Sequence, residues 1–184
     1  MDERSGCAGF TLIELLVVVA LVVILQSLAA PAFSAMVNSM RLTTATNLLF
    51  SSLMLARSEA IKRNSRAVVC KSDTGNDCTT TGGWEQGWIV FHDANNNAAL
   101  DAGEDVVSRE QALPQPILLT GNGPVASYVS YTPMGTTSYK SGAFQAGTLT
   151  VCTQSSSSVP AREIKISSTG RPRTLKTTVA QCPV

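Results

Sequence analysis

The stretch from residue 10 to residue 40 constrains this chain most, because it holds a single charged side chain, Glu14. The run from Leu15 to Leu25 is aliphatic apart from Ala20. An apolar helix of about 20 residues crosses the hydrocarbon core of a bilayer, which is roughly 30 Å thick. The sequence therefore predicts a membrane-spanning helix over residues 10–34.

A cleaved secretory signal is the alternative interpretation of this segment, since Ala30-Pro31-Ala32 resembles a small-residue cleavage site. Three features oppose it. The residues before the apolar run include Asp2 and Glu3 beside Arg4, whereas a secretory signal begins with a basic region. The run is also long, and a carboxylate lies inside it. These features favour a retained anchor.

Glu14 needs a partner, because an ionised side chain at bilayer depth costs about 2.5–3.5 kcal/mol on insertion scales. A cut after Gly9 would supply one, since it frees a positive amine at Phe10. That amine lies four residues before Glu14, so one helical turn lets the two groups meet within a chain or between neighbouring chains.

The segment Gly9-Phe10-Thr11-Leu12-Ile13-Glu14-Leu15-Leu16 resembles the class III signal of type IV pilins and type II secretion pseudopilins. The resemblance implies that residues 1–9 are a leader, which a prepilin peptidase removes after Gly9. It also implies N-methylation of Phe10 and pairing of Glu14 with a neighbour's terminal amine during assembly. Other pilins or pseudopilins, the peptidase and the inner membrane are the partners implied.

The helix is expected to continue to residue 64, with Pro31 bending or locally melting it. Residues 35–64 form the amphipathic half, because apolar residues recur there at helical spacing and should pack on a globular head. The members of this stripe are Ala45, Leu49, Leu53, Ala56 and Ala60. The segment Ala56-Arg57-Ser58-Glu59-Ala60-Ile61-Lys62-Arg63 resembles the branch that contains the H-type pseudopilin and the minor pilin FimT.

Residues 65–184 should form a β-rich head, because short β-prone runs there alternate with Gly, Pro, Asn, Asp and Ser. The predicted strands are 67–71, 88–92, 106–109, 117–120, 128–132, 148–153 and 162–167. The family resemblance returns in three short motifs. They are Trp84-Glu85-Gln86-Gly87-Trp88-Ile89-Val90-Phe91, Tyr131-Thr132-Pro133-Met134-Gly135, and Ile164-Lys165-Ile166-Ser167 followed by Gly170-Arg171. The expected fold is the α+β pilin fold, a long N-terminal helix packed on an antiparallel β-sheet.

Cys7 leaves with the leader, so the mature chain keeps Cys70, Cys78, Cys152 and Cys182. An even number of cysteines in a domain facing an oxidising periplasm predicts disulfides. Four cysteines allow three connectivities. The pairs Cys70 with Cys78 and Cys152 with Cys182 are favoured, because each closes a local unit. A zinc site is the alternative use, but no C-x-x-C pair occurs and His92 is the single histidine.

Positive charge is concentrated at the C-terminus. Residues 161–184 hold five basic side chains and one acidic one, a charge of +4, while the rest of the chain carries −3. Gly170-Arg171-Pro172-Arg173 resembles the G-R-x-R signature of DNA-binding FimT minor pilins. Arg171 and Arg173 can project from one side of an extended segment, and Lys176 and Lys165 can extend the patch. Alternatively, these arginines cap the sheet or pair with acids of a neighbouring subunit.

Residues 93–104 match the ligand spacing of a calcium loop at five positions, but Ala98 stands where such a loop has glycine. Asn and Asp are also common hairpin formers, so an acidic hairpin loop is favoured over a calcium site. No catalytic motif is recognisable, and a lone His92 does not make a general base. The sequence predicts neither an enzyme nor a metal or other cofactor.

Two functions remain. The first is a FimT-like minor type IV pilin that binds double-stranded DNA through phosphate contacts for natural transformation. The second is an H-type minor pseudopilin, a subunit of a type II secretion filament that contacts only other subunits. The basic C-terminus favours the first, because a scaffold needs no concentrated positive charge there. In either case the chain starts as a single-pass inner-membrane protein with a periplasmic head.

Overall fold

The computed structural model of the chain describes residues 10–155 and 157–183, except the side chain of Leu28. Gly9 and Cys7 lie outside the described residues. The chain divides into two compact units, Met1–Asn38 and Ser39–Val184. One helix, α1 (Leu12–Arg63), contributes to both of them.

In the first unit the apolar side chains of α1 are exposed, for example Leu12 at 77% and Leu25 at 66%. Its most apolar window has a mean hydropathy of 2.7, and none of that window is buried. By length and composition this helix can cross a membrane. The helix continues through Pro31 without melting, so the local unwinding considered from the sequence does not occur.

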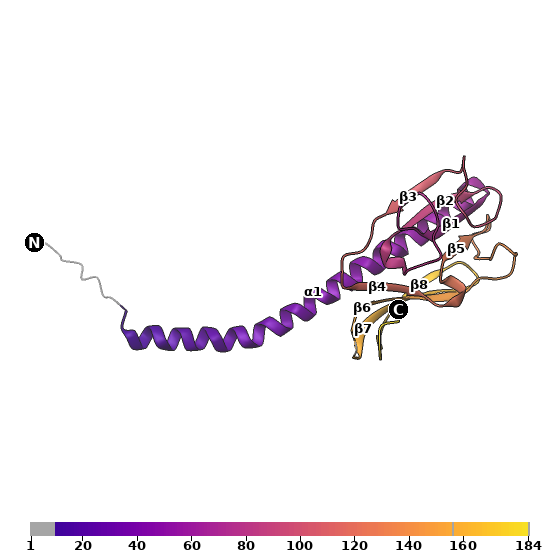
Figure 1. Cartoon of the computed structure of the whole chain (residues 1–184). Coiled ribbons are helices and arrows are strands. Elements are labelled where there is room, and N and C mark those ends of the chain that lie inside the picture. Colours follow the sequence, from indigo (N-terminus) through magenta and orange to yellow (C-terminus); the bar gives the residue numbers. More distant parts are fainter. Residues whose placement is uncertain (1–9, 156, 184) are drawn as a thin grey trace, which may run out of the picture. The chain divides into compact units, whose positions relative to one another are not determined.

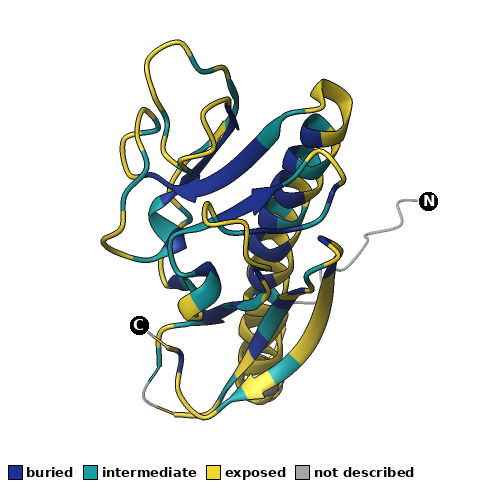
Figure 2. Ribbon diagram, turned by 90° about the vertical axis from the view of Figure 1, so that its right-hand side faces the viewer, coloured by how far each residue is buried: buried dark blue, intermediate teal, exposed yellow. Residues whose placement is uncertain are grey.

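In the second unit α1 turns one apolar stripe towards the strands, as the buried residues in Figure 2 show. All five members of the predicted stripe are less than 5% exposed, and Leu42 extends it towards the N-terminus. The helix ends at Arg63, followed by Asn64 with a φ of 49°. The amphipathic half predicted from the 3.6-residue period is therefore confirmed as core.

Two antiparallel sheets pack against the buried stripe of this half of α1 (Figure 1). The first has the order β3-β2-β1-β5 and the second the order β4-β6-β7-β8. The strands of the first sheet are β1 (Arg66–Lys71), β2 (Trp88–Asp93), β3 (Val106–Glu110) and β5 (Tyr128–Tyr131). Those of the second are β4 (Ile117–Gly121), β6 (Gly147–Thr153), β7 (Val159–Ile166) and β8 (Pro172–Val179). Two short 3₁₀ helices, η1 (Trp84–Gln86) and η2 (Gly123–Val125), lie between strands.

All seven strands predicted from the sequence are present, but two expectations need correction. The single sheet expected is in fact two. The basic segment after Gly170, treated as a tail, is the eight-residue edge strand β8. It was missed because its alternation is weak: only Pro172 is buried, and both of its faces are largely polar.

One core joins the helix to both sheets, and two tryptophans lie within it. Trp88 donates a hydrogen bond from Nε1 to Ser52 Oγ at 2.9 Å, which ties β2 to α1. Trp84 donates from Nε1 to the Val125 carbonyl at 3.1 Å. Both rings are fully buried, and these bonds satisfy their only polar atoms. The architecture is the predicted α+β fold, a long N-terminal helix packed on antiparallel sheets.

Candidate functional site

The start of α1 contains a capping arrangement that the sequence analysis missed. Thr11 Oγ1 accepts a hydrogen bond from the Glu14 backbone N–H at 3.3 Å. In return, Glu14 Oε2 accepts one from the Thr11 backbone N–H at 3.2 Å. This is the reciprocal capping box, and the sequence signal was the spacing Thr-x-x-Glu. Glu14 therefore has a local role in starting the helix, besides the amine pairing expected for it.

The second sheet presents its basic residues on two different faces. Directly paired residues of antiparallel strands share a face, and successive residues alternate between faces. Val151 pairs with Arg162, and Arg162 with Lys176. Since Val151 is a core residue, Arg162 and Lys176 lie on the face that turns towards α1. The opposite face, here called the outer face, carries Lys165 and Arg173.

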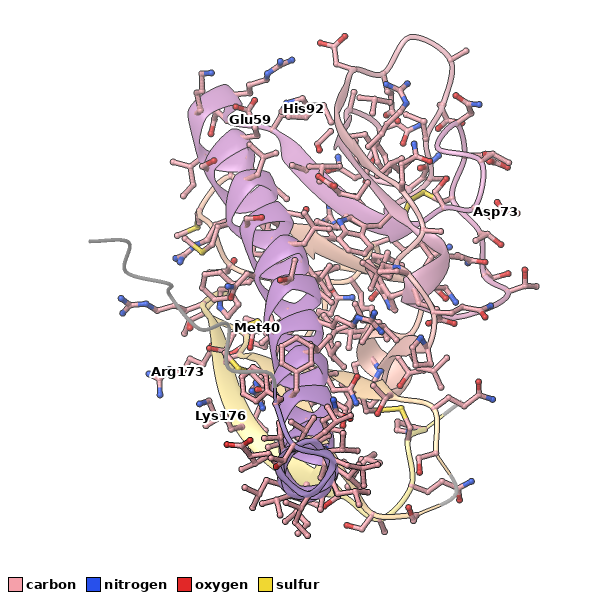
Figure 3. All side chains as sticks on the ribbon, turned by 90° about the vertical axis from the view of Figure 1, so that its left-hand side faces the viewer. Met40, Glu59, Asp73, His92, Arg173 and Lys176 are labelled. Carbon is pink, nitrogen blue, oxygen red and sulfur yellow. A yellow bond between two sulfur atoms is a disulfide. The ribbon has the colours of Figure 1, made fainter. Side chains whose placement is uncertain are left out.

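On the outer face Lys165 lies directly opposite Arg173 across the β7–β8 pair. Glu163, on the same face, forms an ion pair with Lys165, with Nζ and Oε2 3.1 Å apart. Arg173 is exposed and has no ion-pair partner in the part of the chain that the structure describes. Figure 3 shows its side chain beside β8, the edge strand of the sheet.

Arg171 is exposed and occupies the turn immediately before β8. Gly170 sets this turn, with a φ of 74° that favours glycine. A Cβ atom at Gly170 would also lie 2.0 Å from the Gly135 carbonyl oxygen. That same oxygen accepts a hydrogen bond from Arg57 Nε at 3.0 Å, so α1 fixes the loop against which Gly170 packs. The backbone around Arg171 is therefore held by contacts with the head.

Lys176 does not share the face of Arg173, so the four basic residues proposed from the sequence do not form one patch. With Arg162 it borders a groove of about 220 Å³ between β7–β8 and α1. Arg162 Nη2 donates a hydrogen bond to Ser39 Oγ at 3.2 Å. Lys165, Arg173 and the adjoining Arg171 remain as the outer-face cluster.

The two disulfides join the pairs that the sequence favoured. Cys70 is bonded to Cys78, eight residues away, and Cys152 to Cys182, thirty residues away. Cys152 and Cys182 are both buried in a small cluster with Ala161. The second bond therefore fastens the segment that follows β8 to the second sheet.

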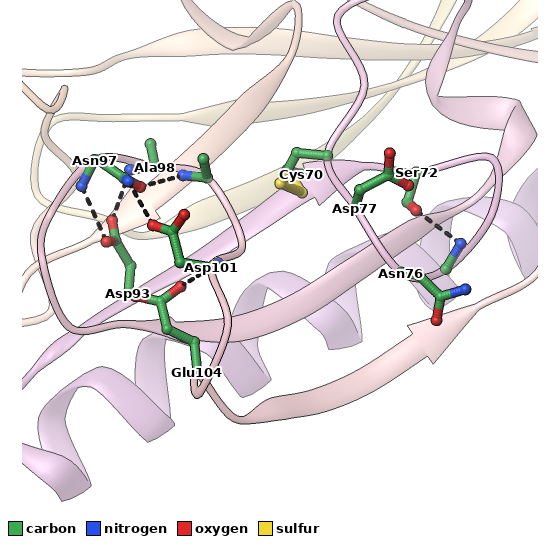
Figure 4. Close-up of a disulfide and its surroundings, with 12 residues drawn as sticks. Cys70, Ser72, Asn76, Asp77, Asp93, Asn97, Ala98, Asp101 and Glu104 are labelled. Carbon is green, nitrogen blue, oxygen red and sulfur yellow. Dashed lines mark hydrogen bonds between the residues drawn. A yellow bond between two sulfur atoms is a disulfide. The ribbon is translucent and has the colours of Figure 1, made fainter.

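The loop between β2 and β3 uses its acidic groups internally (Figure 4). Asp93 accepts hydrogen bonds from the backbone N–H groups of Asn97 and Ala98, at 3.0 and 2.9 Å. Asp101 Oδ2 accepts from Asn97 Nδ2 at 2.6 Å, and Glu104 Oε1 accepts from the Ala94 N–H at 2.8 Å. Ala98 adopts a φ of 59°, the left-handed conformation that a calcium loop gives to glycine. Among the described residues, no group of three or more His, Cys, Asp or Glu is placed to hold a metal ion.

His92 contacts a carboxylate, in a position that ties two elements of the head together. Its Nε2 lies 3.2 Å from Glu59 Oε2, joining β2 to the last turns of α1. Lys62 and Arg63 also contact Glu59, at 3.5 and 3.3 Å. Burial works against ionisation of Glu59. The His92 hydrogen bond and the two cations outweigh it, so the pKa of Glu59 lies below its usual value. This cluster connects α1 to the first sheet.

Comparison with known proteins adds three findings. The model of a family described as type II transport protein GspH matches residues 45–170. A prokaryotic N-terminal methylation motif matches residues 4–28. No curated protein matches the chain.

Among solved structures, the chain is similar to the type IV minor pilin FimU of Pseudomonas aeruginosa. In one crystal form of FimU the TM-score is 0.56 at 18% identity, covering 77% of this chain and 95% of the crystallised FimU chain. In another form the TM-score is 0.52 at 17% identity, covering 77% and 100%. At this identity the similarity shows the fold alone.

Proposed function

Because the chain belongs to the GspH family of pilin-like filament subunits, we propose that it is a minor type IV pilin that binds double-stranded DNA for natural transformation. Membership of the family implies assembly with other pilins, and the methylation motif implies processing by a prepilin peptidase. DNA binding and its use in DNA uptake are the proposed part.

The observation that supports DNA binding is the outer-face cluster. Lys165 and Arg173 lie side by side across β7–β8, with Arg171 exposed at the start of the edge strand. Like charges directly opposite one another destabilise a strand pair, so such a pair is costly without a function. Glu163 offsets one of the three positive charges and leaves a net charge of +2 on this face. A surface of this kind attracts phosphate groups.

The chemistry of the cluster fits phosphates better than bases. Arginine offers a planar set of donors that binds phosphate oxygens in a bidentate manner. Base-specific recognition needs side chains that enter a groove of the duplex. Arg173 on the edge strand and Arg171 in the turn before it offer mainly contacts to the DNA backbone. Binding is therefore expected to be independent of sequence and strongly salt-dependent.

We further propose the division of the chain that the sequence suggested. Residues 1–9 are removed after Gly9, Phe10 is methylated, and Glu14 pairs with a neighbour's terminal amine during assembly. Residues 10–34 anchor the subunit in the inner membrane, residues 35–64 form the amphipathic half of the helix, and residues 65–184 form the periplasmic head. The two disulfides agree with an oxidising compartment.

The alternative is an H-type pseudopilin of a type II secretion system, which the description of the matching family favours. In that case the outer-face cluster would contact acidic residues of a neighbouring subunit. The two functions make different demands on Arg171 and Arg173. A scaffold subunit would lose assembly when these residues are neutralised, whereas a DNA receptor would lose uptake and keep assembly.

A transformation experiment with the double substitution R171Q/R173Q tests the proposal. The frequency of transformation should fall by at least tenfold, while the subunit remains in sheared filaments at its normal level. The double substitution R162Q/K176Q removes the same charge from the other face and serves as the matched control. Normal transformation by R171Q/R173Q, or loss of the subunit from filaments, would favour the secretion scaffold.

A further inference from the structure

The groove between α1 and the β7–β8 pair has features that DNA binding on the outer face does not explain. Arg162 and Lys176 lie directly opposite each other across β7–β8 and both border this groove. Neither cation has a carboxylate partner within the described part of the chain, whereas Lys165 on the outer face is paired with Glu163. A like-charge pair across two strands is unfavourable unless an anion lies between its members. The groove therefore has the charge of an anion site.

Most of the remaining residues of the groove are polar. Thr43, Thr46 and Asn47 line it from α1, and Thr174 and the apolar Leu175 line it from β8. Thr43 and Thr46 donate their hydroxyl hydrogens to helix carbonyls, at 2.8 and 2.6 Å. The lining groups left to donate to a ligand are therefore the two cations, the Asn47 amide and the Thr174 hydroxyl. Several donors around a space of about 220 Å³ can surround a phosphate group.

The position of the groove along the chain indicates the source of the phosphate. Arg162 is hydrogen-bonded to Ser39, which follows Phe10 by 29 residues of chain, nearly all of it in α1. At 1.5 Å per residue this distance is about 44 Å, and a typical tilt of about 20° reduces it to about 41 Å. A bilayer with both headgroup layers is about 40–45 Å thick. A helical segment of this length is enough to cross the bilayer, and Ser39 follows directly after the unit that contains this segment.

The positions of the charged residues along α1 agree with a membrane-spanning segment that ends before Ser39. Arg41 is the first charged residue after Glu14, and it is exposed two positions beyond Ser39. Arg41 and Ser39, the hydrogen-bond partner of Arg162, therefore both come just after the uncharged stretch of the chain. Basic residues close to a membrane surface are attracted to anionic lipids, and each strengthens the interaction several-fold.

We propose that this groove binds the phosphate of an anionic phospholipid headgroup while the subunit is anchored in the membrane before assembly. Arg162 and Lys176 neutralise the phosphate, and Asn47 and Thr174 donate to its oxygens. The proposal rests on the membrane anchor and is independent of DNA binding on the outer face. It predicts that the lipid must be released when the subunit leaves the bilayer for a filament.

Native mass spectrometry of the full-length protein in detergent tests this site. The protein is titrated with phosphatidylglycerol, with phosphatidylcholine and with inorganic phosphate. Each of the two cations should strengthen binding of the anionic lipid about fivefold. The wild type should therefore bind phosphatidylglycerol roughly 30-fold more tightly than phosphatidylcholine. The preference should disappear in R162Q/K176Q. It should persist in R171Q/R173Q, which carries the same change of charge on the outer face.

The swap R162K/K176R keeps both charges and should keep the preference for phosphatidylglycerol. The fluorescence of the buried Trp84 and Trp88 reports whether each variant is folded. Equal binding of the two lipids by the wild type would overturn the proposal. So would a preference retained by a folded R162Q/K176Q protein. Inorganic phosphate that binds as tightly as phosphatidylglycerol would indicate a free-anion site. Loss of duplex DNA binding in R162Q/K176Q, but not in R171Q/R173Q, would indicate a DNA site in the groove.

Discussion

Arg173 lies directly opposite Lys165 across the β7–β8 pair, on the face of the second sheet that turns away from α1. Glu163 neutralises Lys165 on this face, and Arg171 precedes the strand. The pairing of the strands thus places the Arg173 guanidinium beside the Lys165 ammonium group, whose charge Glu163 already offsets. Within the described part of the chain, neither Arg173 nor Arg171 has an ion-pair partner. This arrangement is the physical basis of the proposed DNA contact, and the turn at Gly170 positions it.

Gly170→Ala should destabilise the head and disturb the cluster. The backbone there has a φ of 74°, and the added Cβ would lie 2.0 Å from the Gly135 carbonyl oxygen. The expected loss in the free energy of unfolding is about 2 kcal/mol or more, since strain and overpacking add. Urea denaturation of the head measures it. Gly142→Ala, with a φ of 85° but no atom within 4 Å of the new Cβ, is the control and should cost less.

The two disulfides should contribute unequally to stability. In the chain-entropy model, closing a loop constrains the unfolded chain more when the loop is longer. The Cys152–Cys182 bond, with a separation of 30, should contribute about 3–4 kcal/mol. The Cys70–Cys78 bond, with a separation of 8, should contribute about 1 kcal/mol less. Denaturation of C152S/C182S and C70S/C78S heads compares them, and a larger loss in C70S/C78S would contradict this order.

The Glu59 cluster should make the stability of the head depend on pH below about pH 4.5. Burial raises the pKa of Glu59. The His92 hydrogen bond and the charges of Lys62 and Arg63 lower it by more than burial raises it, so the pKa lies below its ordinary value of 4.5. A lowered pKa contributes stability above the unfolded pKa, and this stability is lost as the pH falls through the folded pKa. At neutral pH, Glu59→Gln should cost about 1.5–3 kcal/mol, the range for hydrogen bonds to charged groups.

Thermal unfolding of the wild-type and Glu59→Gln heads between pH 3 and pH 7 measures this effect. The difference between the two proteins should shrink as the pH falls below 4.5. A difference that stays constant over the whole range would show that the carboxylate charge contributes nothing to folding.

Glu14→Ala should prevent incorporation into filaments while leaving the head folded. The substitution removes the carboxylate proposed to pair with a neighbour's amine, and an amine left unpaired in a low-dielectric environment is costly. It also removes the capping bond to Thr11. Thr11→Ala serves as the control, because it removes the Oγ1 side of the capping box but keeps the carboxylate. Immunoblots of sheared filaments should show the Thr11→Ala subunit and little of the Glu14→Ala subunit.

Much of this fold could be predicted from local patterns. The apolar run, the stripe from Ala45 to Ala60 and the seven β-prone segments each carry a periodicity that specifies one type of element. The arrangement of the strands in two sheets was beyond such patterns, because pairing joins residues far apart in the sequence. Tyr131, for example, pairs with Ala67 on a strand more than sixty residues earlier.

The basic residues show the same limit at the level of side chains. Their number and the Gly170-Arg171 turn could be read from the sequence. Which residues share a face depends on β8 being a strand and on its register with β7. That register places Arg173 with Lys165 but moves Lys176 to the groove beside Arg162, a residue for which the sequence predicted no binding role.

The salt dependence of duplex DNA binding by the purified head, Ser39–Val184, tests the proposed function most directly. The head contains both disulfides and the whole buried core, so it is a compact unit by itself. Each phosphate contact contributes a slope of about −0.9 to a plot of log K against log salt.

The wild type should bind measurably at low salt with a slope of about −2 to −3, from two or three contacts. In R171Q/R173Q the magnitude of the slope should fall by about 2, and in R162Q/K176Q it should not change. A wild-type head that binds no DNA at low salt, or an R171Q/R173Q head with an unchanged slope, would contradict the account.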